Sequence, residues 1–324
     1  MKIFCTGIHG SNRRNYIKKF EDYCKERGKT VKHLDVAHTM FDIGRSLDIP
    51  LSKEKILDLD DLALKFLRSA AFERIISQVG DEDITIIDSH ANFLWKNDFR
   101  QAFDVSYLRR FNPDLYITII DNPIKIHKKL EQNPQWKGKL NLGNVIHWQC
   151  VEELETKTAA QFAGKPFYLI PQGQPGSTLY ELIFEPEKEL TYLSAPITHL
   201  DAENMQKVDK FAKKLMEYKN VILPIFIGDA PLEWKLVVDN DTVNRDKKLV
   251  RQCREVVVYF PKIVHSSGVI TEQITGFENN QKVYTIFPSP HYSPFTSYPS
   301  DYIFYSEDEF FKFLEEEKKL KDRR

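Results

Sequence analysis

The chain has 324 residues, which is long for one domain and comfortable for two that each bury a core. Its 46 basic and 47 acidic residues give a net charge of -1, so no overall field attracts polymeric nucleic acid or a membrane surface. No apolar run approaches the roughly 20 residues that span a bilayer. The cysteines Cys5, Cys24, Cys150 and Cys253 show neither paired spacing nor a zinc pattern. Together these features predict a cytoplasmic protein with reduced cysteines and no metal site.

Short apolar runs alternate with amphipathic segments through the first half, as a parallel α/β sheet requires. Helices are expected at Tyr16–Arg27, Lys53–Val79, Pro123–Gln132 and Asn144–Phe162, and strands at Lys2–Thr6, Thr30–Leu34, Asp83–Asp88, Asp114–Asp121 and Phe167–Ile170. Asp35 and Asp88 stand at strand ends, the edge where such sheets bind ligands. Trp95, Trp136 and Trp148 are expected to pack in the core, as large aromatic side chains usually do.

The turn Gly7–Asn15 follows the first strand, where a phosphate-binding loop would lie. Such a loop ends in Gly-Lys-Ser/Thr, because the ammonium reaches the phosphates and the hydroxyl holds magnesium. Here Asn12, Arg13 and Arg14 occupy those places, and arginine does not substitute for lysine in so confined a loop. A plain turn between strand and helix is the alternative interpretation.

Residues 1–170 resemble archaeal-type adenylate kinase and related nucleotide kinases. The resemblance rests on Gly7-x-x-Gly10, on Asp35 after the second strand, and on Ile87-Asp-Ser-His-Ala91, which is similar to the family's Ile-Asp-Thr-His-Ala. It implies a P-loop kinase fold with a degenerate phosphate loop, and Mg²⁺ as cofactor only if the domain is active. The nucleotide-binding residues that it implies are Gly7, Gly10, Ser11, Arg13, Asp35 and Asp88.

The densest cluster of turn-forming residues, Pro171–Ser177, and the helix-breaking Pro186 place a domain boundary near residue 186. The predicted domains are therefore 1–186 and 187–324. In the second domain we expect helices at Ala202–Tyr218, Asp246–Cys253 and Glu307–Lys321, strands at Leu190–Ser194, Val221–Pro224 and Val256–Phe260, a loop at Gly228–Pro231, and an irregular, proline-rich segment after Phe287.

The strand Val256–Phe260 is followed by Pro261 and then by Ser266, Ser267 and Gly268, residue types that begin helices. A helix N-terminus with small residues suits an anionic group. Glu272 lies about one turn into this helix and can face the same pocket. In the alternative interpretation Ser266 only caps the helix, and Glu272 lies on its solvated face.

Residues 190–290 resemble the nucleoside 2-deoxyribosyltransferase superfamily, which includes 2'-deoxynucleoside 5'-monophosphate N-glycosidases. Tyr192-Leu-Ser-Ala-Pro-Ile197 is similar to the family's Tyr-Leu-Ala-Gly-Pro-Ile, and Ser266-Ser-Gly-Val-Ile-Thr-Glu272 to its Ser-x-Gly-x-x-x-Glu block. Asp246 matches the acidic residue that heads the preceding helix. The resemblance implies a Rossmann-like domain and a homo-oligomer.

The resemblance also implies roles. Glu272 would attack the anomeric carbon, Tyr192 would orient it, and Asp246 would assist the departure of the base. The substrate would contact Ser266, Ser267, Gly268, Pro196 and Ile197. The transferases carry Asp where this chain has Ser266, and a hydroxyl there favours a 5'-phosphate.

Arg254 stands where the family usually has a second Asp. It could bind phosphate, pair with Glu255, or mark a changed activity. The sequence thus predicts an N-glycosidase that needs no cofactor and acts on a small-molecule nucleotide. A nucleoside 2-deoxyribosyltransferase, a nucleotide kinase and a non-catalytic nucleotide sensor are the alternatives, and the base and sugar stay open.

Overall fold

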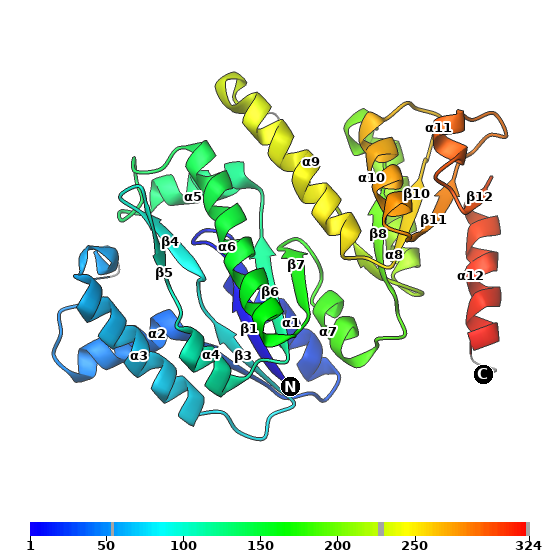
Figure 1. The fold of residues 1–324 in the computed structure, drawn as a ribbon. Helices are drawn as coiled ribbons and strands as arrows, with labels where there is room; N and C mark the ends of the chain where they lie inside the picture. The colour runs from blue at the N-terminus through cyan, green and yellow to red at the C-terminus, as the bar shows by residue number, and fades with distance from the viewer. Residues whose placement is uncertain (53–54, 226–229, 322–324) are drawn as a thin grey trace. The chain divides into compact units, whose positions relative to one another are not determined.

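A computed structural model describes residues 1–52, 55–225 and 230–321 as an α/β protein with two parallel five-stranded sheets (Figure 1). The predicted α/β class is confirmed. The chain divides into two compact units, a first unit of Met1–Ser177 and Ile227–Val238 and a second unit of Thr178–Phe226 and Asp239–Arg324. Among the described residues, no helix combines the length and apolar character needed to cross a bilayer.

The first unit is built on a sheet in the order β2-β3-β1-β6-β7, in which every neighbouring pair is parallel. All residues of β3 and β6 are buried, as expected of apolar strands covered on both faces. Trp95, Trp136 and Trp148 lie in one apolar cluster, as predicted. The elements are β1 (Lys2–Thr6), α1 (Arg13–Glu26), β2 (Val31–Asp35), α2 (Val36–Ser46), η1 (Ile56–Asp58), α3 (Asp61–Ser77), β3 (Ile84–Asp88), β4 (Asn92–Trp95), β5 (Asp98–Gln101), α4 (Val105–Phe111), β6 (Leu115–Ile120), α5 (Pro123–Gln132), α6 (Leu142–Ala163) and β7 (Phe167–Pro171).

The two largest differences from the predicted helix bounds of the first unit are at α1 and α3. Helix α1 begins at Arg13 rather than Tyr16, because Asn12 adopts a left-handed conformation with φ 56° and ends the loop there. Of the predicted helix Lys53–Val79, Asp61–Ser77 is α-helical and Ile56–Asp58 forms the short 3-10 helix η1, while residues 53–54 lie outside the described part of the chain.

Helix α2 and the hairpin β4–β5 were not expected. The side chain of Asp35 caps α2 by accepting the N–H of His38 at 2.8 Å. The hairpin turns through Lys96 and Asn97, whose φ values are 53° and 63°. Both residues of a type I' turn need positive φ, and the missing glycine conceals the hairpin in the sequence.

The second unit has a parallel sheet in the order β12-β11-β10-β8-β9. Because β8 is followed by β9 on one side and β10 by β11 on the other, the direction of winding changes between β8 and β10. The elements are α7 (Ser177–Phe184), β8 (Leu190–Ser194), η2 (Ile197–His199), α8 (Ala202–Leu215), β9 (Asn220–Ile222), α9 (Lys235–Arg251, which begins in the first unit after η3, Leu232–Trp234), β10 (Glu255–Tyr259), α10 (Ser267–Glu278), β11 (Lys282–Ile286), α11 (Pro294–Ser297), β12 (Tyr302–Phe304) and α12 (Glu307–Lys321).

Two predictions for the second domain are corrected. Helix α9 begins at Lys235, so Asp246 lies inside the helix rather than at its head. The proline-rich segment expected to be irregular contains α11 and the edge strand β12, which pairs with β11. Of the predicted loop Gly228–Pro231, the first two residues lie outside the described part.

Candidate functional site

Glu272 lies between two hydroxyl groups of strand β8. Tyr192 and Ser194 are two residues apart, so their side chains emerge on the same face of the sheet, and both are fully buried. The Tyr192 hydroxyl donates to Oε1 of Glu272 at 2.7 Å, and the Ser194 hydroxyl donates to Oε2. Both oxygens of the carboxylate are therefore held by the sheet, and Glu272 does not lie on a solvated helix face.

The close approach of helix α10 to the sheet makes these contacts reachable. The helix contacts β8, β10 and β11. A Cβ on Gly276 would lie 2.6 Å from a methyl carbon of Val256 on β10, so only glycine permits this separation. Glu272, one turn before Gly276, is thereby brought to the hydroxyls of β8.

The environment of Glu272 favours its protonated form more than water does. Burial, with the nearby negative charge of Asp246, raises the pKa of Glu272 to about 7 against the lowering effect of the two hydroxyl donors. Burial likewise raises the pKa of Asp246 to about 6, although Arg245, whose guanidinium lies 3.4 Å from Oδ1 of Asp246, lowers it. The site thus holds two interacting carboxyl groups that both titrate near neutrality, a pattern that is frequent at catalytic sites.

Ser266 is the N-cap of α10, with its buried side chain accepting the N–H of Val269 at 3.4 Å. Ser267 and Gly268 are exposed in the first turn, where helical N–H groups are available to an anion. Along the helix axis, Ser266 and Glu272 are about 9 Å apart at 1.5 Å per residue.

Pro196 and Ile197 follow the carboxyl end of β8, with Pro196 buried and Ile197 partly exposed. The carboxyl ends of β8 and β10 are the point where the winding of the sheet changes, which is where open α/β sheets bind ligands. Arg254 is exposed at the opposite, amino end of β10, and the carboxylate of its neighbour Glu255 is held by Lys219 at 2.7 Å. This placement separates Arg254 from the strand ends that the predicted substrate residues occupy.

In the first unit, the glycine loop is closed on itself. Gly10, with φ 90°, allows a tight turn in which the N–H of Ser11 donates to the carbonyl of Ile8 at 3.1 Å. Arg13, which is 9% exposed, donates to the carbonyl of Gly7 and pairs with Asp88. The cation at the position where the resemblance to nucleotide kinases predicts a phosphate-loop lysine is therefore engaged by the protein itself.

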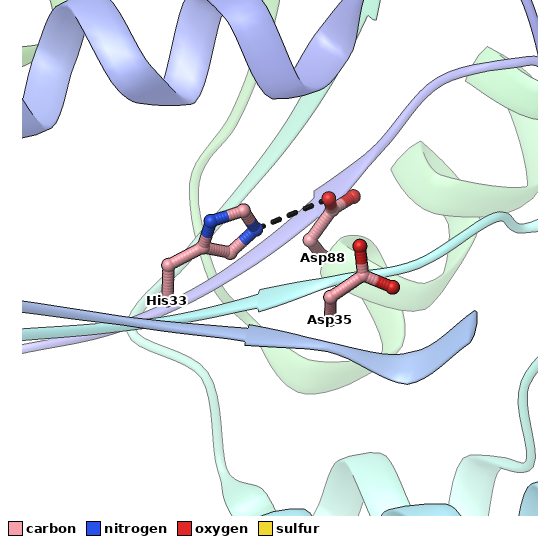
Figure 2. A group of neighbouring side chains, drawn as sticks. All are labelled: His33, Asp35 and Asp88. Atoms are coloured by element: carbon pink, nitrogen blue, oxygen red, sulfur yellow. Dashed lines mark hydrogen bonds and ion pairs between the residues drawn. The ribbon is translucent and has the colours of Figure 1, made fainter. Parts of the chain in front are cut away.

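Asp88 is the centre of a group of charged side chains (Figure 2). His33 lies 3.1 Å from Oδ2 of Asp88, and Asp35 is next to both, so that one ligand atom of each residue lies within 4.8 Å of the others. Burial of the His33 ring opposes its protonation, but hydrogen bonds to Asp88 and Glu21 raise the pKa of His33 to about 9. A metal ligand must be a neutral imidazole, and Arg14 pairs with Asp35, so the cluster is suited to balancing its own charges rather than to binding a cation.

Sequence reasoning missed two residues that hold the sites together. Ser194 could have been found from its alternation with Tyr192 along the strand. Glu152 is fully buried on α6 and accepts the N–H groups of Gly7, Ala91 and Asn92 at 2.9, 2.9 and 3.0 Å. The sequence does contain a signal for Glu152: it lies four residues after Trp148, which places an acidic residue on the buried face of α6.

A cavity of about 1360 Å³ lies in the first unit. Of the residues expected to bind a nucleotide there, Gly10, Ser11, Arg13 and Asp88 line it. Gly7 instead contributes its backbone to Glu152 and Arg13, and Asp35 caps α2.

No protein-family model matches this chain, and no curated protein matches it either.

Proposed function

We propose that the second unit is an N-glycosidase that cleaves the bond between base and sugar in a (deoxy)nucleoside 5'-monophosphate, with Glu272 as the nucleophile. The observation that carries this proposal is the pair of hydroxyl donors, Tyr192 and Ser194, on the two oxygens of Glu272. Donors of this kind fix the direction of a carboxylate and favour its ionised form. The choice of this reaction rests on the resemblance of Tyr192–Ile197 and Ser266–Glu272 to nucleotide N-glycosidases.

In the first step a carboxylate oxygen of Glu272 forms a bond to the anomeric carbon while the bond from that carbon to the base nitrogen breaks. The base takes the bonding electrons, and Asp246 in its protonated form supplies the proton that neutralises the leaving nitrogen. Water then attacks the anomeric carbon and gives its proton to the Asp246 carboxylate, while the bond from that carbon to Glu272 breaks; a free sugar phosphate leaves, and Glu272 returns to its carboxylate form and Asp246 to its protonated form. The anomeric configuration is retained, because two displacements occur.

Ser266 and the first turn of α10 are the proposed site of the 5'-phosphate. The hydroxyl of Ser266 carries no negative charge, and the N–H groups of Ser267 and Gly268 face an exposed turn. The substrate would therefore be a nucleotide rather than a nucleoside.

Chromatography of reactions with a panel of ribo- and deoxynucleoside monophosphates and the matching nucleosides tests the proposal. We expect free base to appear from at least one monophosphate, at least tenfold faster than from its nucleoside. Exchange of the base with no release into water would indicate a deoxyribosyltransferase, and ADP formation from ATP a kinase. Binding of a monophosphate without any product would favour a nucleotide sensor.

The two carboxyl groups predict a narrow pH optimum. Glu272 must be ionised to attack, and Asp246 must be protonated to assist. Because the pKa of Asp246, about 6, lies below that of Glu272, about 7, only a minority of molecules carry both states at once, and this fraction falls as the pH drops below about 6 or rises above about 7. A profile with its maximum between these values is expected, and Asp246→Asn should remove the alkaline limb. A plateau reaching far above neutral pH would contradict the role of Asp246.

A further inference from the structure

Arg245 carries a buried positive charge beside the proposed active site of the second unit. It lies on α9 directly before Asp246, and it is 7% exposed. A charged side chain is almost never buried to this degree without partners of opposite sign. No step of the proposed glycosidase reaction involves Arg245, so the reaction alone does not account for a cation at this position.

Three acceptors surround the guanidinium of Arg245. Nη1 lies 3.4 Å from Oδ2 of Asp241, one turn earlier on the same helix, and Nη2 lies 3.4 Å from Oδ1 of Asp246. Nη2 also lies 3.5 Å from the carbonyl oxygen of Ile225, just beyond strand β9. The planar guanidinium is therefore held between its own helix and the segment after β9, with one nitrogen directed at the carboxyl group of Asp246.

The charged and titratable groups around Asp246 come from three elements. Arg245 and Asp241 lie on α9, Tyr192 on β8 and Glu272 on α10. Burial, followed by the charge of Asp246, raises the pKa of Glu272, and burial with the charges of Glu272 and Asp246 raises the pKa of Tyr192. Burial raises the pKa of Asp246 itself to about 6, while Arg245 lowers it and Asp241 raises it. Arg245 is thus the cation that acts against burial at Asp246.

The proposed first step moves one negative charge from Glu272 to Asp246. Glu272 is a carboxylate before this step and a neutral ester after it, while Asp246 gives its proton to the leaving nitrogen and becomes a carboxylate. Arg245 lies where the new charge forms. A fixed cation at that place lowers the energy of the glycosyl-enzyme relative to the substrate complex, and it does so without rearranging.

We propose that Arg245 is a positioning residue, which holds the carboxyl group of Asp246 in place and stabilises the negative charge that forms on it when the base departs. This inference rests on the proposed glycosidase reaction. The nitrogens of Arg245 face Asp241, Asp246 and Ile225 rather than the substrate. Asp241 has the complementary part, because its carboxylate holds the guanidinium and reduces the effect of the positive charge on Asp246.

Variants of Arg245 and Asp241 are expected to change the titration of Asp246 in opposite directions. Carbon-13 NMR of protein labelled at the aspartate carboxyl groups follows this titration, and the signal of Asp246 is the one missing from Asp246→Asn. Arg245→Gln removes the cation and should raise the midpoint from about 6 by about one pH unit or more, whereas Asp241→Asn should lower it. Arg245→Lys keeps the charge and should shift the midpoint less than Arg245→Gln does. Arg251→Gln, an exposed position at the end of the same helix, is the matched control.

The pH optimum of kcat/KM for base release gives a second readout. This optimum lies midway between the pKa values of Asp246 and Glu272, so it is expected to move up by about half a pH unit in Arg245→Gln and down in Asp241→Asn. Loss of a merely structural contact would lower the activity at every pH and leave the optimum unchanged.

Three results would overturn this inference: an unchanged midpoint in Arg245→Gln, shifts of the same sign in Arg245→Gln and Asp241→Asn, or equal shifts in Arg245→Gln and Arg245→Lys. The NMR titration needs no turnover, so it decides whether Arg245 controls Asp246 even if no base is released, a result that would overturn the proposed function instead. Circular dichroism would show whether Arg245→Gln folds. If it does not, Asp241→Asn tests the same balance of charges, and a midpoint that rises or stays the same in this variant would overturn the inference.

Discussion

Replacing Glu272 with glutamine is expected to reduce base release at least about 10³-fold, because an amide cannot form the glycosyl ester. Glutamine keeps the length of the side chain and an oxygen that accepts from Tyr192 or Ser194, so the fold should be retained. The measurement is the initial rate of base formation from the best nucleoside monophosphate of the panel, with the KM of each variant determined separately.

Glu278→Gln is the matched control for this experiment. Glu278 is the last residue of the same helix and is exposed, so the same chemical change should leave the rate within about twofold, as is usual for surface substitutions. If Glu272→Gln retained the wild-type rate, the carboxylate would not be the nucleophile and the proposed function would fail. A rise in KM at unchanged kcat would assign Glu272 to substrate binding instead.

Replacing Asp88 with asparagine is expected to destabilise the first unit by about 3 to 5 kcal/mol, the usual cost of removing one partner of a buried ion pair. Arg13 is 9% exposed and would keep its charge without the carboxylate. All four tryptophans, Trp95, Trp136, Trp148 and Trp234, belong to the first unit. Urea unfolding followed by tryptophan fluorescence therefore reports on this unit.

Asp35→Asn is the comparison for Asp88→Asn. Asparagine still caps α2, and the partner of Asp35 is the largely exposed Arg14, so we expect a change of no more than about 1 kcal/mol. The double variant Arg13→Met with Asp88→Leu should recover much of the lost stability, because it removes both buried charges. If Asp88→Asn and Asp35→Asn lowered the free energy of unfolding equally, the buried pair would contribute no more to stability than the exposed one.

The sequence was most informative where a pattern is local. Strands β1 and β8 and helices α5 and α12 have the predicted bounds, because apolar runs, a proline at a helix start and runs of charge act within a few residues. The placement of Glu272 one turn into a helix capped by Ser266 follows from the same local rules.

Contacts between distant segments explain what the sequence concealed. The first turns of α9 contain Val237, Val238, Asp239 and Asn240, residues with modest helix propensity, yet Val238 packs on Leu142 and Ile146 of α6. Such packing overrides propensity. Likewise, nothing near Glu152 in the chain reveals that its carboxylate accepts the N–H groups of Gly7, Ala91 and Asn92, which are 60 or more residues away.

The two hydroxyl donors on Glu272 bear on the lifetime of the proposed glycosyl ester. When one carboxylate oxygen bonds to the sugar, the other becomes the carbonyl oxygen of the ester and keeps its hydroxyl donor. That donor draws electrons away from the ester and stabilises the carboxylate that departs when water arrives. Strand β8 would thus assist both halves of the cycle, and the covalent adduct should be short-lived unless the sugar itself is deactivated.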